Sequence, residues 1–191
     1  MTIRTVEIDF EYMNYVDAPP RQAKDLYSQA CSNDGVTINT WKKTWLSQIK
    51  ANREKYGSFS EKSIGKLYNS KKLQPAILMG SGPSLKNNIH LLKDVKDIVK
   101  ISCLHNFHYC EDHDVHVDYY VSLDAGEITL NEMAIGGKKT LEEYLEATRN
   151  KTLLCYIGSH PKLLESWRGE ILFFSCPTPD PQLDAEIREI D

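Results

Sequence analysis

The sequence predicts an α/β fold, in which a mostly parallel β-sheet follows a helical N-terminal extension. Short apolar runs bounded by turn residues follow residue 72, and such runs are typical of strands buried on both faces of a parallel sheet. Ahead of residue 72 the clearest pattern is helical, since Trp41, Trp45 and Ile49 share one helix face. We therefore divide the chain into an extension at residues 1–72 and a sheet domain at residues 73–191. The boundary is soft, because the two parts can share a core.

Proline, glycine and turn dipeptides divide the extension into separate elements. Asp17–Pro20 is a break, because its two prolines cannot continue a strand ladder. The predicted elements are, in order, an edge strand at residues 3–15, a short helix at Arg21–Ala30 that stops near Asn33-Asp34-Gly35, a helix at Thr40–Tyr56 with Thr40 as its N-cap and Gly57 as its end, and a helical piece at Ser60–Leu67.

The sheet domain alternates apolar runs with helical patterns, as parallel sheets with helical crossovers do. The predicted strands are Ala76–Met79, Ile98–Cys103, Tyr119–Leu123, Thr152–Ile157 and Ile171–Phe174. The predicted helices between them are Phe107–Asp112, Leu141–Thr148 with Thr140 as its cap, and Pro161–Trp167.

Composition excludes several classes of protein. The 191 residues carry a net charge of −4, which gives no electrostatic argument for a nucleic-acid or membrane partner. No apolar run approaches the length of a bilayer span, and the N-terminus lacks the basic start and apolar core of a signal peptide. The five cysteines are scattered, without a C-x-x-C pair, as in a reducing compartment. We expect a cytoplasmic protein with neither a nucleic-acid nor a membrane partner.

The segment Gly80–Ser84, Gly-Ser-Gly-Pro-Ser, ends the first predicted strand. In an open parallel sheet, ligands bind beyond the carboxyl ends of the strands. The two glycines permit positive φ and close approach of a ligand, and Pro83 suits the first turn of a helix. Free amides are then expected at Ser84 and Leu85, where they and the serine hydroxyls would favour an anion.

Two known phosphate-binding loops do not fit this segment. A P-loop needs a Lys-Ser/Thr pair after the glycines, and none is present. The dinucleotide fingerprint needs a third small residue, where Leu85 stands. A tight strand-to-helix turn without a ligand therefore remains the alternative on this chemistry alone.

Two segments nevertheless resemble a specific family. Ile77–Leu85 is Ile-Leu-Met-Gly-Ser-Gly-Pro-Ser-Leu, and Val117–Asp124 is Val-Asp-Tyr-Tyr-Val-Ser-Leu-Asp. Both are similar to the domain shared by archaeal 6-hydroxymethylpterin diphosphokinase-like (MptE-like) proteins and bacterial motility-associated flagellin glycosyltransferases. That domain is distantly similar to bacterial sialyltransferases that use CMP-sugars. The similarity covers roughly residues 40–175, and only these two segments are distinctive.

The resemblance implies a Rossmann-like sheet that holds a nucleotide. Asp124 would bind a ribose hydroxyl or hold Mg²⁺, which takes one or two carboxylates together with phosphates. From the residues alone, Asn106 as a helix N-cap and Asp124 as a turn cap stay open. The implied nucleotide-binding residues are Gly80, Ser81, Gly82, Ser84, Asn106 and Asp124.

The C-terminal end departs from the family's pattern. We expect a later segment, rich in glycine and serine, that begins another helix and completes the site, and none precedes Asp191. If the protein ends there, we expect a truncated sheet domain that binds a nucleotide but lacks part of the catalytic apparatus. If the sequence is a fragment, we expect the rest of the site in the missing part.

Two histidines are candidates for acid–base catalysis, because the pKa of imidazole suits that role. His105 precedes Asn106, and His160 follows the fourth predicted strand. A nearby cluster of cysteines and histidines lacks C-x-x-C and H-x₃-H spacing. We expect its histidines to be ordinary loop residues, and a zinc site is the alternative. The cluster falls within fourteen positions and consists of Cys103, His105, His108, Cys110, His113 and His116.

These observations lead to one functional hypothesis and two alternatives. We expect a nucleotide-binding transferase, namely a glycosyltransferase with a nucleotide-sugar (CMP-sugar-like) donor. The alternatives are a Mg²⁺-dependent ATP diphosphokinase of the 6-hydroxymethylpterin type and a non-catalytic nucleotide-binding or assembly module. The expected ligand is a nucleotide or nucleotide-sugar, with Mg²⁺ in the diphosphokinase, and the sequence does not identify the acceptor.

Overall fold

The computed structural model describes residues 20–190, so the predicted strand at residues 3–15 lies outside the described residues. The chain forms two compact units, Met1–Trp41 and Lys42–Asp191. The sheet belongs to the second unit, together with residues 42–72 of the predicted extension. A separate role for residues 1–72 stays a prediction.

One long helix, α1 (Pro20–Tyr56), replaces the two predicted helices. The predicted stop near Asn33-Asp34-Gly35 is wrong, because a glycine inside a helix costs only about 1 kcal/mol and a long helix absorbs that cost. Thr40 is not an N-cap, since its hydroxyl donates to the Val36 carbonyl at 2.8 Å, one turn back along the helix. The predicted end is correct: Gly57 takes φ +76° and its amide donates to the Arg53 carbonyl at 3.1 Å.

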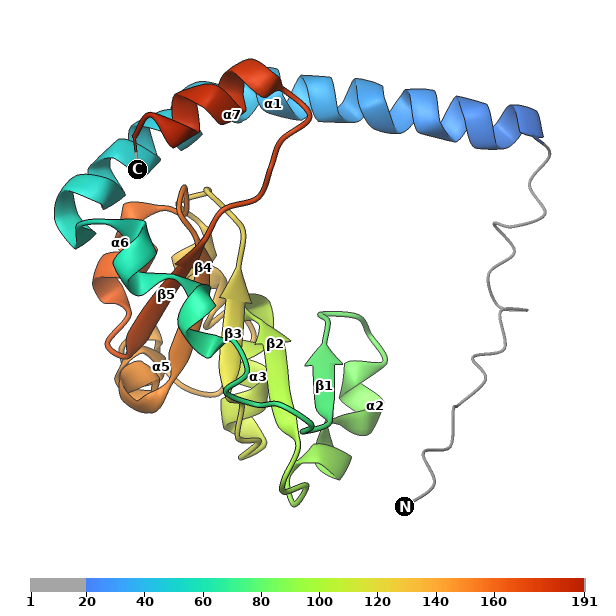
Figure 1. The fold of residues 1–191 in the computed structure, drawn as a ribbon. Helices are drawn as coiled ribbons and strands as arrows, with labels where there is room; N and C mark the ends of the chain where they lie inside the picture. Colours follow the sequence, from blue (N-terminus) through green and yellow to red (C-terminus); the bar gives the residue numbers. More distant parts are fainter. Residues whose placement is uncertain (1–19, 191) are drawn as a thin grey trace. The chain divides into compact units, whose positions relative to one another are not determined.

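Five parallel strands form one sheet, in the order in which they occur along the chain (Figure 1). Each predicted strand is confirmed to within one residue at either end, and with them the α/β fold class. The strands are β1 (Ala76–Met79), β2 (Val99–Cys103), β3 (Tyr119–Ser122), β4 (Thr152–Tyr156) and β5 (Glu170–Phe174).

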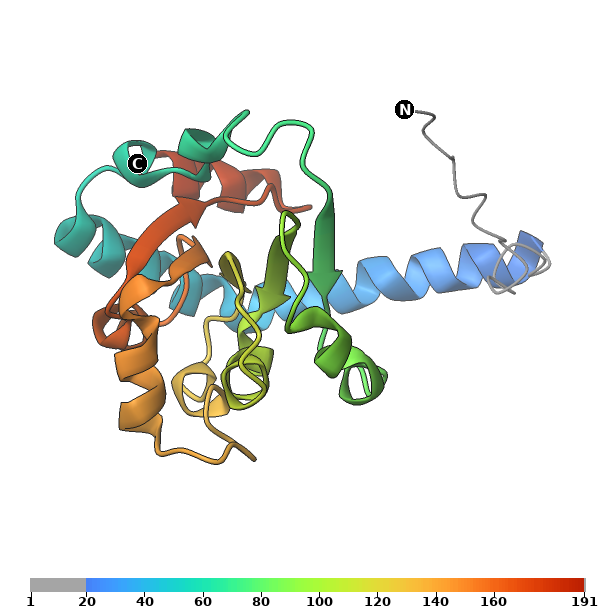
Figure 2. The same cartoon turned by 90° about the horizontal axis from the view of Figure 1, so that it is seen from below.

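The strand order determines where the connecting helices lie. Crossovers between parallel strands are right-handed, so an order that never reverses places successive crossovers on the same face. Figure 2 shows α2 (Leu85–Asn88), α3 (Phe107–Asp112) and α5 (Leu141–Ala147) together on one face. The other connecting elements are η4 (Ile89–Leu92), η5 (Leu104–Asn106), α4 (Thr129–Glu132), η6 (Thr148–Asn150) and α6 (Pro161–Ser166).

The core lies between the sheet and these helices. Phe107 of α3 and Tyr120 of β3 are fully buried, with ring centroids 4.7 Å apart. The expectation that the strands are buried on both faces holds for β5, where the neighbouring residues Leu172 and Phe173 point to opposite faces and are both buried. It is wrong for the second face of β1, β2 and β3. Ile101 and Val121 are only half-buried there, and the side chain of Leu78 on edge strand β1 is 79% exposed.

Two 3₁₀ helices, η2 (Phe59–Lys62) and η3 (Ile64–Leu67), form the predicted helical piece after α1 and run beside β5. The rings of Phe59 and Phe173 lie 4.9 Å apart. The C-terminal segment forms α7 (Pro181–Arg188), whose N-cap Asp180 accepts the amides of Gln182 and Leu183. Segment 42–56 of α1 and helix α7 are joined by an ion pair between Lys42 and Glu186, with a nitrogen–oxygen distance of 3.1 Å.

Thiol reactivity tests this packing. Burial raises the pKa of Cys110 to about 11 and that of Cys155 to about 12, whereas Cys31 and Cys176 are exposed. Only thiolates are nucleophilic, so Ellman's reagent at pH 8 is expected to modify the two exposed thiols in the native protein and the two buried thiols only after unfolding. Fast modification of Cys110 or Cys155 in the native protein, read by mass spectrometry, would contradict the packing.

Candidate functional site

The predicted site residues all follow the carboxyl ends of strands (Figure 1). The segment Gly80–Ser84 follows β1, Asn106 lies just beyond β2, Asp124 follows β3 and His160 follows β4. Neighbouring strands lie about 4.8 Å apart, so the ends of β1 and β4 are separated by roughly 14 Å. The structure therefore brings Asn106 to the Gly80–Ser84 turn and leaves His160 at a distance.

The Gly80–Ser84 turn is exposed and open. A Cβ atom on Gly80 would meet nothing within 4 Å, and one on Gly82 would meet only the Ser84 hydroxyl at 3.9 Å. The expected role of positive φ is not found here, because among the described residues the glycines with positive φ are Gly57 and Gly136. Open space above the backbone is what these two glycines provide.

The backbone amides of the turn divide into two groups. Contrary to the prediction, the Leu85 amide is engaged, because it donates to the Gly82 carbonyl at 3.1 Å within a tight turn. The amides of Ser81, Gly82 and Ser84 meet no acceptor among residues 20–190. Ser84 makes no side-chain cap to α2. Three amides and two hydroxyls at this exposed turn are thus available to a ligand.

Asn106 holds the turn in place. Its side chain is buried, and Nδ2 lies 3.2 Å from the Gly80 carbonyl, 3.3 Å from the Met79 carbonyl and 3.2 Å from Ser102 Oγ. The side chain makes no N-cap bond to α3, so that alternative is wrong. Asn106 therefore ties the end of β2 to the end of β1 and positions the turn.

His105 lies next to this cross-link and is paired with a carboxylate. Its Nε2 is 2.6 Å from Oε2 of Glu132 on α4, and the imidazole is about half exposed. A histidine oriented by a carboxylate is a common arrangement for proton transfer. Glu132 was not predictable, because nothing in the sequence indicates that α4 returns to the end of β2.

Asp124 and His160 each make a local cap. Asp124 is exposed, and its Oδ1 accepts the Gly126 amide at 2.7 Å, as in the turn-cap alternative. His160 is the N-cap of α6, where its Nδ1 accepts the Lys162 amide at 3.3 Å. With Nδ1 as an acceptor, the proton of the neutral imidazole lies on Nε2.

No group of three or more His, Cys, Asp or Glu side chains in the described chain could hold a metal ion. The cysteines and histidines for which a zinc site was the alternative have other surroundings. Cys103 lies in β2, His105 pairs with Glu132, and the centre of the His113 ring lies 4.4 Å from that of Tyr109. A Mg²⁺ ion at Asp124 would depend on the phosphates of a ligand for its remaining contacts.

Segment 42–56 of α1 supports the loops at the same edge of the sheet. Gln48 Nε2 donates to the Ala125 carbonyl at 3.0 Å, beyond β3. Asn52 Nδ2 donates to the Ile157 and Ser159 carbonyls, both at 2.9 Å, beyond β4. Neither residue was predicted, although two amide side chains beside the apolar stripe of a helix were the available signal.

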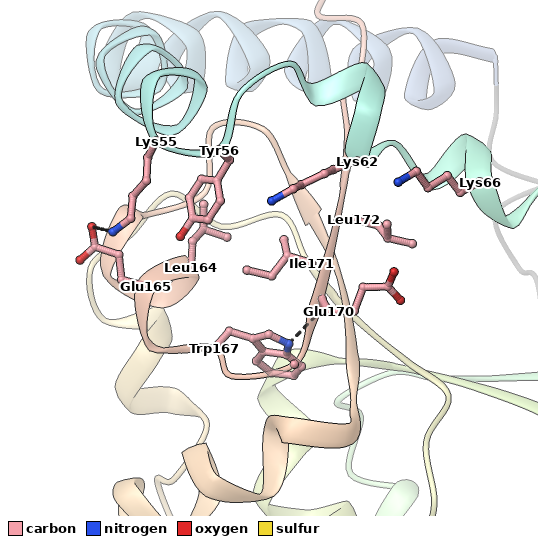
Figure 3. A pocket seen from close by; sticks show the side chains of 11 residues that line it. Lys55, Tyr56, Lys62, Lys66, Leu164, Glu165, Trp167, Glu170, Ile171 and Leu172 are labelled. Carbon is pink, nitrogen blue, oxygen red and sulfur yellow. Dashed lines mark hydrogen bonds and ion pairs between the residues drawn. The ribbon is translucent and has the colours of Figure 1, made fainter.

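A separate cavity of about 480 Å³ lies beside β5 (Figure 3). Tyr56 and Trp167 line it together with Lys62 and Lys66. The Lys62 ammonium lies 5.3 Å from the centre of the Tyr56 ring. The cavity includes the amino-terminal part of β5, so it is not part of the site at the carboxyl ends of the strands.

None of the helices in the described part of the chain is both long and apolar enough to cross a membrane. Comparison with curated proteins found no match. Among solved structures, the chain is similar to the MAf glycosyltransferase from Magnetospirillum magneticum AMB-1, with 20% sequence identity and a TM-score of 0.46. That similarity covers 55% of this chain and 16% of the other, so this chain matches only a small part of that protein's length.

A family model gives a much broader match. The model described as 6-hydroxymethylpterin diphosphokinase MptE-like matches residues 45–189, from within α1 to the end of α7. The match includes the Gly80–Ser84 turn, Asn106 and Asp124, and it confirms the resemblance found in the sequence. The chain therefore belongs to the 6-hydroxymethylpterin diphosphokinase MptE-like family.

Proposed function

We propose that the chain is a nucleotide-binding transferase whose donor nucleotide lies against the Gly80–Ser84 turn, and that the donor is a nucleotide-sugar. One observation carries the proposal: the amides of Ser81, Gly82 and Ser84 are unengaged at an exposed turn beyond the carboxyl end of β1. Amides fixed in this way bind phosphate oxygens without having to be reorganised.

Transfer from a nucleotide-sugar requires no covalent intermediate on the protein. Transfer from an activated donor needs positioning and stabilisation of the departing phosphate's charge more than covalent catalysis. The turn would supply that stabilisation, and Asn106 would hold it in register with β2. His105, paired with Glu132, would remove a proton from an acceptor hydroxyl near the turn.

Pyrophosphoryl transfer from ATP is the second candidate, because the family model takes its description from a pterin diphosphokinase. It would use the same turn, with Mg²⁺ held by Asp124 and the phosphates. A non-catalytic nucleotide-binding module is the third candidate.

Calorimetric titration with CMP, CDP, UDP, GDP and ATP, with and without Mg²⁺, separates these candidates. Binding of a cytidine nucleotide without metal supports the nucleotide-sugar donor. Binding of ATP only with Mg²⁺ supports the diphosphokinase. Binding without turnover of any donor supports the module, and no binding to any nucleotide overturns the proposal.

Replacing Gly80 by valine is expected to weaken nucleotide binding by at least about tenfold without changing the melting temperature. The added side chain enters open space, so the fold tolerates it, but it occupies the place assigned to the ligand. Ala76→Val, at the exposed opposite end of β1, is the matched control and should bind like the wild type. Unchanged affinity in Gly80→Val would show that the turn is only structural.

A further inference from the structure

A second cavity, of about 440 Å³, lies at the amino ends of β1, β2 and β3. This is the opposite end of the sheet from the Gly80–Ser84 turn. Basic groups dominate its lining, although the whole chain has a net charge of −4. Its basic lining residues are Lys71, Lys93, Lys96, Lys100 and His116, and its acidic lining residues are Asp97 and Asp118.

Lys100, near the start of β2, is the unusual member of this group. It is only 3% exposed, and its ammonium donates to the Val95 carbonyl at 2.6 Å. No carboxylate in the described chain lies within 4 Å of this ammonium. An ammonium carries three N–H donors, and a buried charge without a counter-ion is costly. Lys100 therefore retains donors and an uncompensated charge at the wall of the cavity.

The acidic groups nearby do not supply the missing counter-ion. Asp118 Oδ2 accepts the backbone amide of Lys100 at 2.9 Å, and its Oδ1 lies 3.8 Å from the Lys71 ammonium. Asp114 pairs with Lys93 at 2.9 Å. Lys96 is exposed and, like Lys100, has no carboxylate within 4 Å among residues 20–190.

We propose that this cavity binds a small phosphate-type anion, such as inorganic pyrophosphate or a phosphate ester. The anion supplies the negative charge that Lys100 lacks and accepts its remaining hydrogen bonds, while Lys96 and Lys71 approach it from the rim. Lysines bind phosphate as point charges, and several of them around one cavity favour a compact multivalent anion over a single carboxylate. The inference does not depend on the nucleotide proposal, because the two sites lie at opposite ends of the sheet.

Calorimetric titration of the full chain with inorganic pyrophosphate at low salt tests this site. The wild type should bind pyrophosphate, and Lys100→Met should weaken that binding by about tenfold or more, as expected for loss of charge-assisted hydrogen bonds. Lys96→Ala should weaken it by about threefold, because an exposed charge contributes less. Inorganic phosphate and the nucleotides are titrated in parallel to distinguish free phosphates from nucleotide phosphates.

One further variant separates this cavity from the cavity beside β5. Lys62→Ala removes an exposed lysine from the cavity beside β5 and should bind pyrophosphate like the wild type. Circular dichroism checks the fold of Lys100→Met. If Lys100→Met does not fold, the pyrophosphate affinity of Lys96→Ala decides the test. Absence of pyrophosphate binding would overturn the proposal. Wild-type affinity in a folded Lys100→Met would also overturn it, as would wild-type affinity in Lys96→Ala if Lys100→Met does not fold.

Discussion

Replacing Gly169 by alanine is expected to destabilise the protein by at least about 3 kcal/mol, although it adds a single methyl group. A Cβ atom at this position would lie 2.1 Å from the Lys151 carbonyl oxygen and 2.3 Å from that of Thr148. Both atoms belong to the backbone, so no side-chain rotation relieves the contact. The Glu170 amide also donates to the Lys151 carbonyl at 3.1 Å, which aligns β5 with β4. Relief of the clash would therefore disturb the pairing of these strands.

Urea denaturation followed by circular dichroism measures this effect. Gly80→Ala is the matched control, because the same methyl group enters open space there and φ lies outside the left-handed region. The control should unfold within about 0.5 kcal/mol of the wild type. Equal stability of the two variants would show that the close approach at Gly169 does not exist in solution.

Replacing Asn52 by aspartate is the second change with a large expected effect, about 3 kcal/mol or more. The Asn52 side chain is 1% exposed, and its Nδ2 donates to the carbonyls of Ile157 and Ser159. Aspartate has the same shape but presents an acceptor to two carbonyl oxygens. The substitution thus removes two buried hydrogen bonds and adds an unpaired buried charge, which destabilises the loop after β4.

The pH dependence of the unfolding free energy of Asn52→Asp shows how much of the destabilisation comes from the buried charge. Protonation of the new carboxyl group removes the buried charge, so the deficit in unfolding free energy should become smaller as the pH is lowered from 7 towards 5. Asn87→Asp, on the exposed surface of α2, is the control and should unfold like the wild type. Wild-type stability of Asn52→Asp at pH 7 would contradict the contact between α1 and the loop after β4.

The strands were predictable because their signal is local. Each one is a short apolar run between turn residues, and that pattern holds whatever the chain packs against. The continuity of α1 was not predictable in the same way, because Asn33-Asp34-Gly35 is a valid turn signal that a helix of this length overrides. The half-exposed second face was missed because an apolar run does not show which of its side chains find a partner.

In the candidate site, too, features with a local sequence signal were predictable and tertiary contacts were not. The sequence indicated where the candidate turn lies, since Gly80–Ser84 follows a strand and carries a motif similar to the family's. It did not show that Asn106 bonds to the Gly80 carbonyl or that Glu132 pairs with His105, because both contacts depend on tertiary structure. Lys100 had a signal that was not used, namely a lysine between the apolar residues Val99 and Ile101 of a predicted strand.

A nucleotide that binds at the Gly80–Ser84 turn should perturb the backbone amides there, and NMR of the ¹⁵N-labelled chain observes each amide separately. During titration with the nucleotide that binds most tightly in calorimetry, we expect the largest shifts at the amides of Ser81, Gly82 and Ser84. We also expect these shifts to disappear in Gly80→Val. Saturable binding that leaves those three amides unshifted, or that shifts residues around the cavity beside β5 instead, would show that the nucleotide binds elsewhere.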